Sequence, residues 1–333
     1  MLYHAFPEEI DPVVFVDAMG NLVDAPGNLA RSLKITPIPG KNAYSIKGQE
    51  GFLCADVGGA IGWRPHCLEF EQFTLISMQE YQQNYVKNKI SFQKNKRSFS
   101  ISKIIHQTHD ETTIPEVFKW GFDRIKEFNP TWQHIYWNAK DRVDFIYENY
   151  GWDILNYYLS INPRYGAARA DLFRYLCIYK MGGVYLDLKS TCDVSFDNII
   201  GSDDQYLLSQ WRNAPGEKSE GCGLGPEVAS VKGGEFQQWH IIAAAGHPFL
   251  EHVINNVLSR IHRYSENYFG TGKLSVLRVT GPYVYTMAIA PILNLYPHRM
   301  FDADRDGLTY SFLGDHTQVF VKHYSREVMP LIL

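Results

Sequence analysis

A pair of glycines between an apolar helix pattern and a short apolar strand is the feature that most constrains this fold. Helical spacing over 164–181 predicts a long helix. The residues on one face of that helix are Leu172, Leu176 and Tyr179. Gly182 and Gly183 are expected to end it, and 184–186 then forms a strand. The segment is typical of a sheet that alternates with helices.

The same alternation extends over much of the chain from residue 101. Strands are predicted over 101–108 and 132–137, and helices over 115–128 and 142–149. Pro115 suits the first turn of its helix. Further helices are expected over 249–264 and after Gly281 and Pro282. This order predicts an α/β domain with a mainly parallel sheet and helices on both faces.

The N-terminal region has a different texture. Short β-like runs punctuated by glycine, such as 13–16, 44–46, 52–56 and 68–75, indicate hairpins. Residues 79–103 are polar and are expected to form a linking helix and a basic connector. We therefore expect a small β-rich accessory module over 1–78, a linker over 79–100 and the α/β domain over 101–333.

Composition excludes several classes of protein. Hydrophobic residues make up 45% of the 333 residues and charged residues 20%, which excludes a mainly disordered chain. The net charge of -4 offers no general basic surface for nucleic acid. We expect no transmembrane segment, because no run of 18 apolar residues occurs, and no signal peptide is visible. The five cysteines form no CxxC pair, so free thiols and a cytoplasmic location are expected.

Polar clusters follow two of the predicted strands. His106, Gln107 and Thr108 end the first strand, and 187–190 follow the strand after the two glycines. Ligands of open α/β sheets sit beyond the carboxyl ends of strands. On the helix between the clusters, Asp171 and Arg174 share a face, where they could bind sugar hydroxyls and clamp a phosphate. Asp187 could bind a divalent cation that bridges a diphosphate.

These residues resemble a known family. The blocks 103–108, 170–175 and 179–189 are similar to the opening strand and the central helix–strand block of glycosyltransferase family 32, whose sugar-binding region contains a DXD motif. The segments 240–250 and 280–282 look like its later signatures, so the likeness covers roughly 101–323. The central block is also similar to that of glucosylating bacterial toxins.

The resemblance implies a GT-A-type, Rossmann-like nucleotide-diphospho-sugar transferase domain. It implies transfer of a hexose from a UDP- or GDP-linked donor to a glycan, lipid or protein acceptor, with retention of configuration. The implied catalytic residues are Asp171, Arg174 and Asp187. The implied donor-binding residues are His106, Gln107, Thr108, Arg169, Asp171, Arg174, Asp187, Lys189, Thr280, Gly281 and Pro282. The implied cofactor is Mn²⁺ or Mg²⁺, held by Asp187 and His323.

One departure from the family pattern leaves three interpretations open. The DXD motif reads Asp187-Leu188-Lys189 here, so a cation replaces the second carboxylate. The metal is held more weakly by Asp187 and His323, with His316 as the competing ligand; or Lys189 itself neutralises the diphosphate; or the enzyme is inactive. The last interpretation gives the alternative function, a glycan-binding protein with a degenerate donor site. A toxin that modifies host proteins is disfavoured, because no delivery segment is visible.

Three further sequence patterns are interpreted as follows: one has a weaker family resemblance, and two have a structural explanation. The run from Tyr44 to Leu75 looks like one leaf of a fascin- or ricin-type β-trefoil, a fold that needs three leaves. Trp211 is expected to pack in the core rather than stack on an acceptor. The acidic run 302–307 imitates a calcium loop but has Leu313 at the twelfth place, where Glu is needed, so we expect a polar turn.

Overall fold

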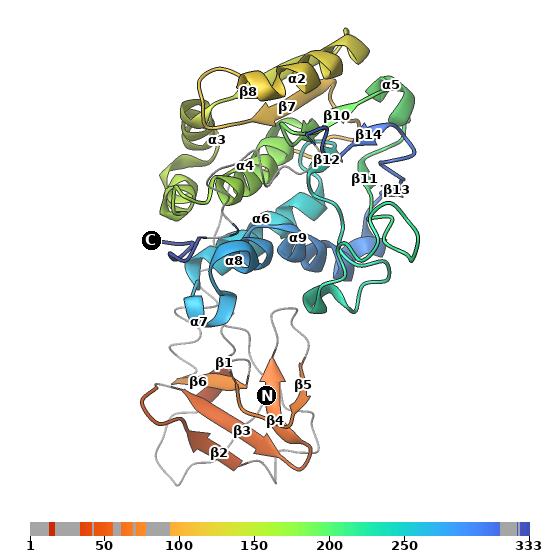
Figure 1. Cartoon of the computed structure of the whole chain (residues 1–333). Coiled ribbons are helices and arrows are strands. Elements are labelled where there is room, and N and C mark those ends of the chain that lie inside the picture. The colour runs from red at the N-terminus through yellow and green to blue at the C-terminus, as the bar shows by residue number, and fades with distance from the viewer. Residues whose placement is uncertain are drawn as a thin grey trace. The chain divides into compact units, whose positions relative to one another are not determined.

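The computed structural model describes residues 13–16, 34–41, 43–55, 61–68, 71–77, 94–313, 325 and 327–333. The chain divides into two compact units (Figure 1). The smaller comprises 1–91 with 262–270, and the larger comprises 92–261 with 271–333. The five cysteines are free thiols, as expected.

The smaller unit contains an antiparallel sheet. Its strands are β1 (Val13–Val16), β2 (Lys34–Pro37), β3 (Tyr44–Gly48), β4 (Gly51–Ala55), β5 (Ile61–Arg64) and β6 (Gln72–Ser77). They pair in the order β1-β6-β3-β4-β5, and β2 adds to β3. Ile46, Leu53 and Phe73 form the buried core. The described strands agree with the β-like pattern of the N-terminal region, whereas the module over 1–78 and its likeness to a trefoil leaf stay predictions. The helix α7 (Glu266–Phe269) also belongs to this unit.

The larger unit alternates strands and helices. In chain order its elements are β7 (Ile104–Thr108), α2 (Glu116–Phe128), β8 (Gln133–Trp137), α3 (Ala139–Ser160), α4 (Gly166–Met181), β9 (Gly183–Leu186), β10 (Thr191–Cys192), α5 (Phe196–Ile199), β11 (Tyr206–Leu208), η2 (Pro226–Val228), β12 (His240–Ala243), α6 (Pro248–His262), α8 (Gly272–Val279), α9 (Pro282–Ile289), η3 (Ala290–Leu295), β13 (Arg299–Met300) and β14 (Leu308–Thr309). The α/β class expected from the sequence is confirmed.

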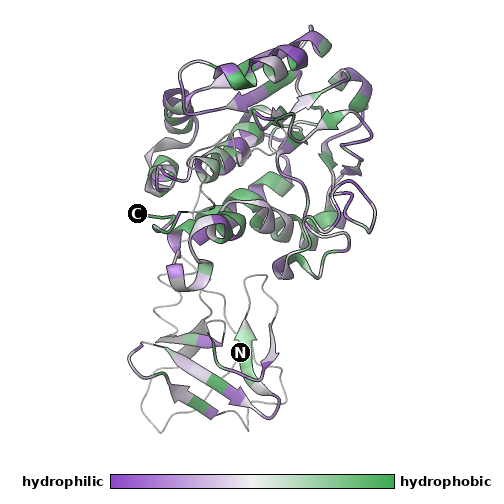
Figure 2. Cartoon of the chain, in the orientation of Figure 1, coloured by the Kyte–Doolittle hydropathy of each residue, from purple (hydrophilic) through white to green (hydrophobic). Residues whose placement is uncertain are grey.

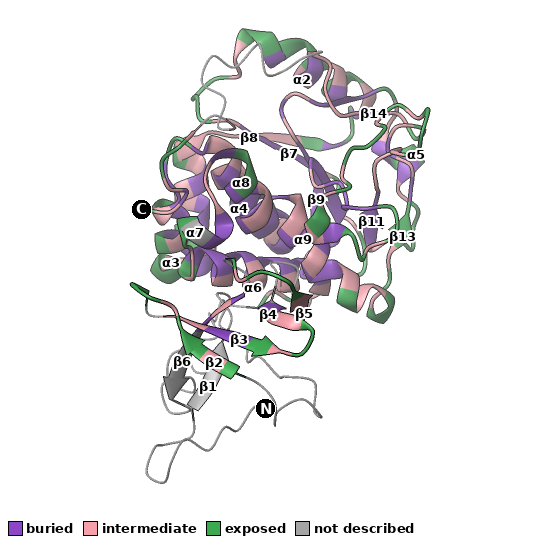
Figure 3. Ribbon diagram, turned by 60° about the horizontal axis from the view of Figure 1, so that its bottom comes forward, coloured by how far each residue is buried: buried purple, intermediate pink, exposed green. Residues whose placement is uncertain are grey.

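The central sheet of this unit is mixed. Its order is β13-β11-β12-β9-β7-β8. Strands β8, β7 and β9 are parallel to one another, β13 is parallel to β11, and β12 is antiparallel to both of its neighbours. Helices α2 and α4 lie on opposite sides of β7 and β8 (Figure 1). Hydrophobic residues run along α6 and α9 (Figure 2), and strands β9 and β11 are completely buried (Figure 3).

Helix α4 differs from the one-faced helix that its spacing predicts. Leu172, Leu176 and Tyr179 are buried, but so is every other residue from 171 to 179. The helix packs against α3 on one side and against β9 and β12 on another. Asp171 and Arg174 are therefore enclosed by the protein, in contrast to an ordinary surface pair.

Some helix boundaries also differ from those expected. The helix expected over 142–149 extends over Ala139–Ser160, and its earlier start is set by a capping box that Asn138 and Asp141 form. It continues through a break at Gly151. Residues 94–103, at the end where the basic connector is expected, form no helix, and residues 79–93, where the linking helix is expected to begin, lie outside the described residues.

One helical run among the described residues is long and apolar enough to cross a membrane. It covers Gly272–Leu295, and an 18-residue window within it has a mean hydropathy of 1.3 and is 50% buried inside the protein. The run is divided by Thr280 and Gly281, which end α8 and begin α9. Buried helices in the core of a protein pass the same test of length and composition.

The glycine pair between α4 and β9 gives a test of the fold. Gly183 has φ +100°, and an added Cβ would lie 2.3 Å from the carbonyl oxygen of Ile104. Gly183→Ala should therefore lower the free energy of unfolding by about 2–4 kcal/mol, from backbone strain and overpacking together. Gly216 has φ +79° with open space around it, so Gly216→Ala should lose only about 1 kcal/mol. Equal losses in urea unfolding would contradict this explanation.

Candidate functional site

A buried arginine joins the two carboxylates that the sequence singles out. Arg174 lies on α4, and its Nη2 is 3.1 Å from Oδ1 of Asp171 and 2.9 Å from Oδ1 of Asp187. Asp171 lies one helical turn before Arg174, and Asp187 directly follows β9. The guanidinium also lies 4.6 Å from the ring centre of Tyr185. The structure thus brings all three predicted catalytic residues together.

Gln238 completes this cluster, and the sequence did not reveal it. Arg174 donates to the carbonyl oxygen of Gln238 at 2.7 Å and to its Oε1 at 3.1 Å. The Gln238 amide in turn donates to Oδ1 of Asp171 at 3.1 Å. Gln238 precedes β12, and β12 runs antiparallel to β9, so its start lies beside the end of β9. Strand direction was the missing signal, because sequence periodicity does not indicate it.

The turn between α8 and α9 supports the same cluster. Thr280 donates through its hydroxyl to Oδ2 of Asp171 at 2.9 Å, and its carbonyl accepts from Tyr175 at 2.8 Å. A Cβ at Gly281 would lie 2.8 Å from the carbonyl oxygen of Val276, so this turn is closely packed. Pro282 begins α9. The predicted 280–282 turn is therefore joined to the site through Thr280.

Burial sets the electrostatics of the cluster. Burial raises the pKa of Asp171 to about 6, although Arg174, Gln238 and Thr280 favour its charged form. For Arg174, burial disfavours the charged form, but Asp187 and other neighbours outweigh it and raise the pKa. Among the neighbours that raise the pKa of Arg174, Asp187 has the largest effect, so it is the main counter-ion of Arg174. Asp187 is also the more accessible carboxylate, with 20% of its side chain exposed.

Lys189 faces the open side of Asp187. Its Nζ lies 4.0 Å from Oδ2 of Asp187 and donates to the hydroxyl of Tyr310 at 2.8 Å. The ammonium also lies 4.3 Å from the centre of the Tyr310 ring. The sequence did not indicate Tyr310, because it is 121 residues away along the chain. Trp211 packs against the core and against Tyr310, as the core interpretation predicts.

The polar end of β7 is only partly joined to this site. Gln107 donates to the carbonyl oxygen of Asp187 at 3.2 Å. His106 is fully buried, with Nε2 3.1 Å from the carbonyl oxygen of Gly182, and burial lowers its pKa to about 4. Thr108 donates to the carbonyl oxygen of Trp137 at 2.7 Å. The positions of His106 and Thr108 are those of structural residues rather than of exposed ligand contacts.

Arg169 is placed apart from the carboxylate cluster. Its guanidinium donates to the carbonyl oxygens of Ile161 and Leu159 and lies 5.5 Å from the ring centre of Tyr158. These contacts anchor the start of α4 to the end of α3. Its expected role in donor binding has no counterpart in this arrangement.

Among the described residues, those that flank Asp187 do not by themselves make a divalent-cation site. Asp187 lies between two cations, Arg174 and Lys189, where a metal would need further oxygen ligands. Within the described ranges there is no group of three histidine, cysteine or acidic residues that could hold a metal. His323 and His316 lie outside the described residues, so their pairing with Asp187 stays a prediction. The acidic run 302–307 forms a turn in which Asp302 and Asp304 pair with basic side chains.

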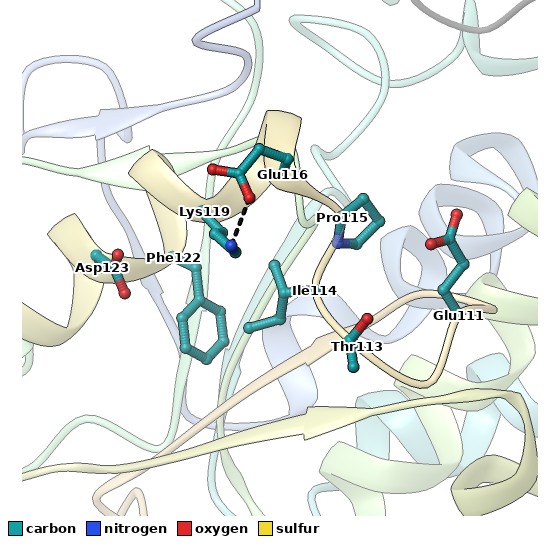
Figure 4. Close-up of a pocket in the computed structure, with 8 residues that line it drawn as sticks. All are labelled: Glu111, Thr113, Ile114, Pro115, Glu116, Lys119, Phe122 and Asp123. Atoms are coloured by element: carbon teal, nitrogen blue, oxygen red, sulfur yellow. Dashed lines mark ion pairs between the residues drawn. The ribbon is translucent and has the colours of Figure 1, made fainter.

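A cavity of about 770 Å³ lies elsewhere, between the loop after β7 and the first turns of α2 (Figure 4). It is lined by Glu111, Thr113, Ile114, Pro115, Glu116, Lys119, Phe122 and Asp123. Three of these residues are acidic, and the one lysine pairs with Glu116. A lining of this charge disfavours a diphosphate, so the carboxylate cluster remains the better candidate site.

Comparisons with known proteins point to the same region. Residues 115–206 match the family model described as glycosyltransferase sugar-binding region containing DXD motif. This segment contains Asp171, Arg174, Asp187 and Lys189. The coarser part of the sequence resemblance, to glycosyltransferases with such a region, is confirmed. Placement in family 32 stays a prediction.

Three proteins of Schizosaccharomyces pombe with sequences similar to this chain are mannosyltransferases. Inositol phosphoceramide mannosyltransferase 3 is 30% identical over 186 residues, covering 56% of this chain and 44% of the relative. Inositol phosphoceramide mannosyltransferase 2 is 27% identical, covering 65% and 55%. Initiation-specific alpha-1,6-mannosyltransferase is 25% identical, covering 58% and 49%. The chain thus spans about half the length of these relatives.

Among solved structures, PaToxG Glycosyltransferase matches 59% of this chain and 74% of its own, with a TM-score of 0.40 and 17% identity.

The raised pKa of Asp171 predicts a particular pH dependence of stability. Between its ordinary value of 3.8 and about 6, the native protein holds this proton more tightly than the unfolded chain does. The contribution of Asp171 to the free energy of unfolding therefore falls as pH rises from about 4 to about 6. Asp171→Asn should flatten that part of the stability curve, measured by urea unfolding at stepped pH. Parallel curves for the variant and the unmodified protein would contradict the burial effect.

Proposed function

We propose that this protein is a nucleotide-sugar-dependent hexosyltransferase with a GT-A-type, Rossmann-like catalytic domain. The single observation that carries the proposal is the position of Asp187. It follows a buried parallel strand, is held on one side by Arg174 and faces Lys189 on the other. The segment matched by the DXD-containing family model includes these residues.

The region beyond the carboxyl end of β9 suits a sugar diphosphate. In open α/β sheets, ligands bind beyond the carboxyl ends of the strands, and Asp187 is the first residue after β9. The Asp187 carboxylate would accept hydrogen bonds from donor hydroxyls, and Lys189 would face the phosphates. Arg174 and Asp171 are too enclosed for a primary ligand role, so they would position Asp187 and Gln238.

The proposed reaction retains the anomeric configuration. The bond between the anomeric carbon and the diphosphate oxygen breaks and leaves an oxocarbenium-like sugar. The acceptor hydroxyl attacks the same face, and its proton passes to the oxygen of the departing diphosphate. The protein's part is positioning and stabilisation of the negative charge that develops on that oxygen.

The similar proteins guide the choice of donor and acceptor. Their names state that they transfer mannose, two of them to inositol phosphoceramide. Mannose-bearing nucleotides are therefore the first donors to test, beside other UDP- and GDP-sugars. A glycan or a glycolipid is the first class of acceptor to test.

A second candidate function rests on Lys189. The lysine in place of the second DXD carboxylate favours an inactive glycan-binding protein with a degenerate donor site. The two functions differ in a direct assay, because a transferase hydrolyses its donor slowly and an inactive protein does not. A panel of UDP-, GDP- and dTDP-sugars, assayed for thermal shift and hydrolysis with and without manganese, separates them. No binding to any nucleotide sugar would refute the transferase proposal.

Asp187→Asn tests the site itself. The variant should fold, because the asparagine keeps an oxygen that accepts from Arg174 and Asp171 stays as a charged partner. Donor hydrolysis or transfer should fall by about 10²–10³-fold through loss of one charged contact. Asp144→Asn is the matched control, since Asp144 is an exposed carboxylate that pairs with Lys140 on α3. Rates would be measured by release of the nucleotide diphosphate, and folding by circular dichroism. Equal rates for both variants would remove Asp187 from the reaction.

A further inference from the structure

We propose that Lys189, held by Tyr310, is a resident cation that binds the donor diphosphate in place of a divalent metal ion. The inference rests on the proposed function and specifies how that site carries positive charge. It predicts that nucleotide diphosphates bind to this protein without any metal.

The ammonium of Lys189 is held in one place. It donates to the Tyr310 hydroxyl at 2.8 Å, lies 4.3 Å from the centre of the same ring, and is 17% exposed. The exposed lysine Lys140, by comparison, is 81% exposed. Ordering a lysine side chain is entropically unfavourable, and both the hydrogen bond and the cation–π contact offset that loss.

Tyr310 is itself positioned by the fold. Strands β10 and β14 pair through Thr191 with Thr309 and Cys192 with Leu308, which ties the segment after Lys189 to the segment before Tyr310. The backbone amide of Phe312 donates to the carbonyl oxygen of Lys189 at 3.1 Å. These bonds bracket both residues, so the contact between their side chains follows from the backbone arrangement.

Two aromatic rings hold the Tyr310 ring from the side. Trp211 and Trp239 meet it edge-on, with centroids 5.1 and 5.6 Å away. Trp211 is fixed in turn by a hydrogen bond of 2.8 Å from its Nε1 to Glu235. These rings hold the Tyr310 side chain, and Tyr310 in turn holds the Lys189 ammonium at a fixed position. A solvated surface lysine has no such support.

The charges of the cluster show what Lys189 adds. Asp171 and Asp187 carry two negative charges, and Arg174 and Lys189 carry two positive charges. Arg174 is 5% exposed and its donors serve Asp171, Asp187 and Gln238. Lys189 is more exposed, and Tyr310 occupies one of its three N–H donors. Of the two cations, Lys189 is thus the one placed to meet phosphate oxygens.

The position of the ammonium also disfavours a metal ion. It lies 4.0 Å from Oδ2 of Asp187, so a divalent ion bound to that oxygen would be close to a like charge. A lysine at this position supplies positive charge to the diphosphate directly, whereas a second carboxylate supplies it by binding a divalent metal ion. Replacing one by the other should therefore exchange metal independence for metal dependence.

The test is calorimetric binding of UDP and GDP to the full chain, once in EDTA and once in manganese. The unmodified protein should bind its nucleotide diphosphate with the same Kd, within about threefold, under both conditions. Lys189→Met should weaken diphosphate binding in EDTA by about 10–100-fold and leave binding of the matching nucleoside unchanged. Lys189→Asp should bind only when manganese is present. Lys140→Met is the control and should behave as the unmodified protein.

The outcomes separate this inference from the proposed function. Binding by the unmodified protein only in manganese would overturn the role of Lys189 and leave the transferase proposal standing. Unchanged diphosphate binding by folded Lys189→Met would also overturn it. Absence of nucleotide binding under every condition would refute the proposed function itself. Tyr310→Phe keeps the ring and removes the hydroxyl. It should therefore weaken diphosphate binding by a smaller factor than Lys189→Met does. If its Kd equals that of the unmodified protein, Tyr310 is not a positioning residue.

Discussion

The arrangement of the candidate site depends on the burial of Arg174 between two carboxylates. A charged guanidinium enclosed by protein is strongly unfavourable unless its charge and its donors are satisfied. Here Asp171 and Asp187 supply the charge, and Gln238 supplies two further acceptors. Because one guanidinium bonds to groups from α4, from the end of β9 and from the start of β12, it fixes these three segments relative to one another.

The hydrogen bonds within the cluster leave one of the two carboxylates more accessible than the other. Asp171 uses both of its oxygens inside the protein, for Arg174 and Gln238 on one and for Thr280 on the other. Asp187 shares only one oxygen with Arg174, and its second oxygen faces Lys189 at 4.0 Å. Of the two carboxylates, Asp171 is thus a buried structural group and Asp187 is the accessible one.

The local parts of this site were predictable from the sequence. The i, i+3 spacing of Asp171 and Arg174, the glycine stop and the strand that ends at Asp187 involve neighbours within a single helix–strand unit. Gln238 and Tyr310 were not predictable, because they lie 64 and 121 residues from their partners and depend on strand direction and on the β10–β14 pairing. The donor-binding roles that the family resemblance implies for His106 and Arg169 stay predictions. In the structure, His106 contacts the carbonyl oxygen of Gly182 and Arg169 donates to that of Ile161, and both contacts are internal to the protein.

The most direct test of the resident-cation proposal is a crystal structure of the protein with its nucleotide diphosphate and manganese together. The proposal predicts phosphate oxygens within hydrogen-bonding distance of the Lys189 ammonium and no metal ion between them and Asp187. A manganese ion bound to Asp187, with Lys189 turned away from the phosphates, would contradict it.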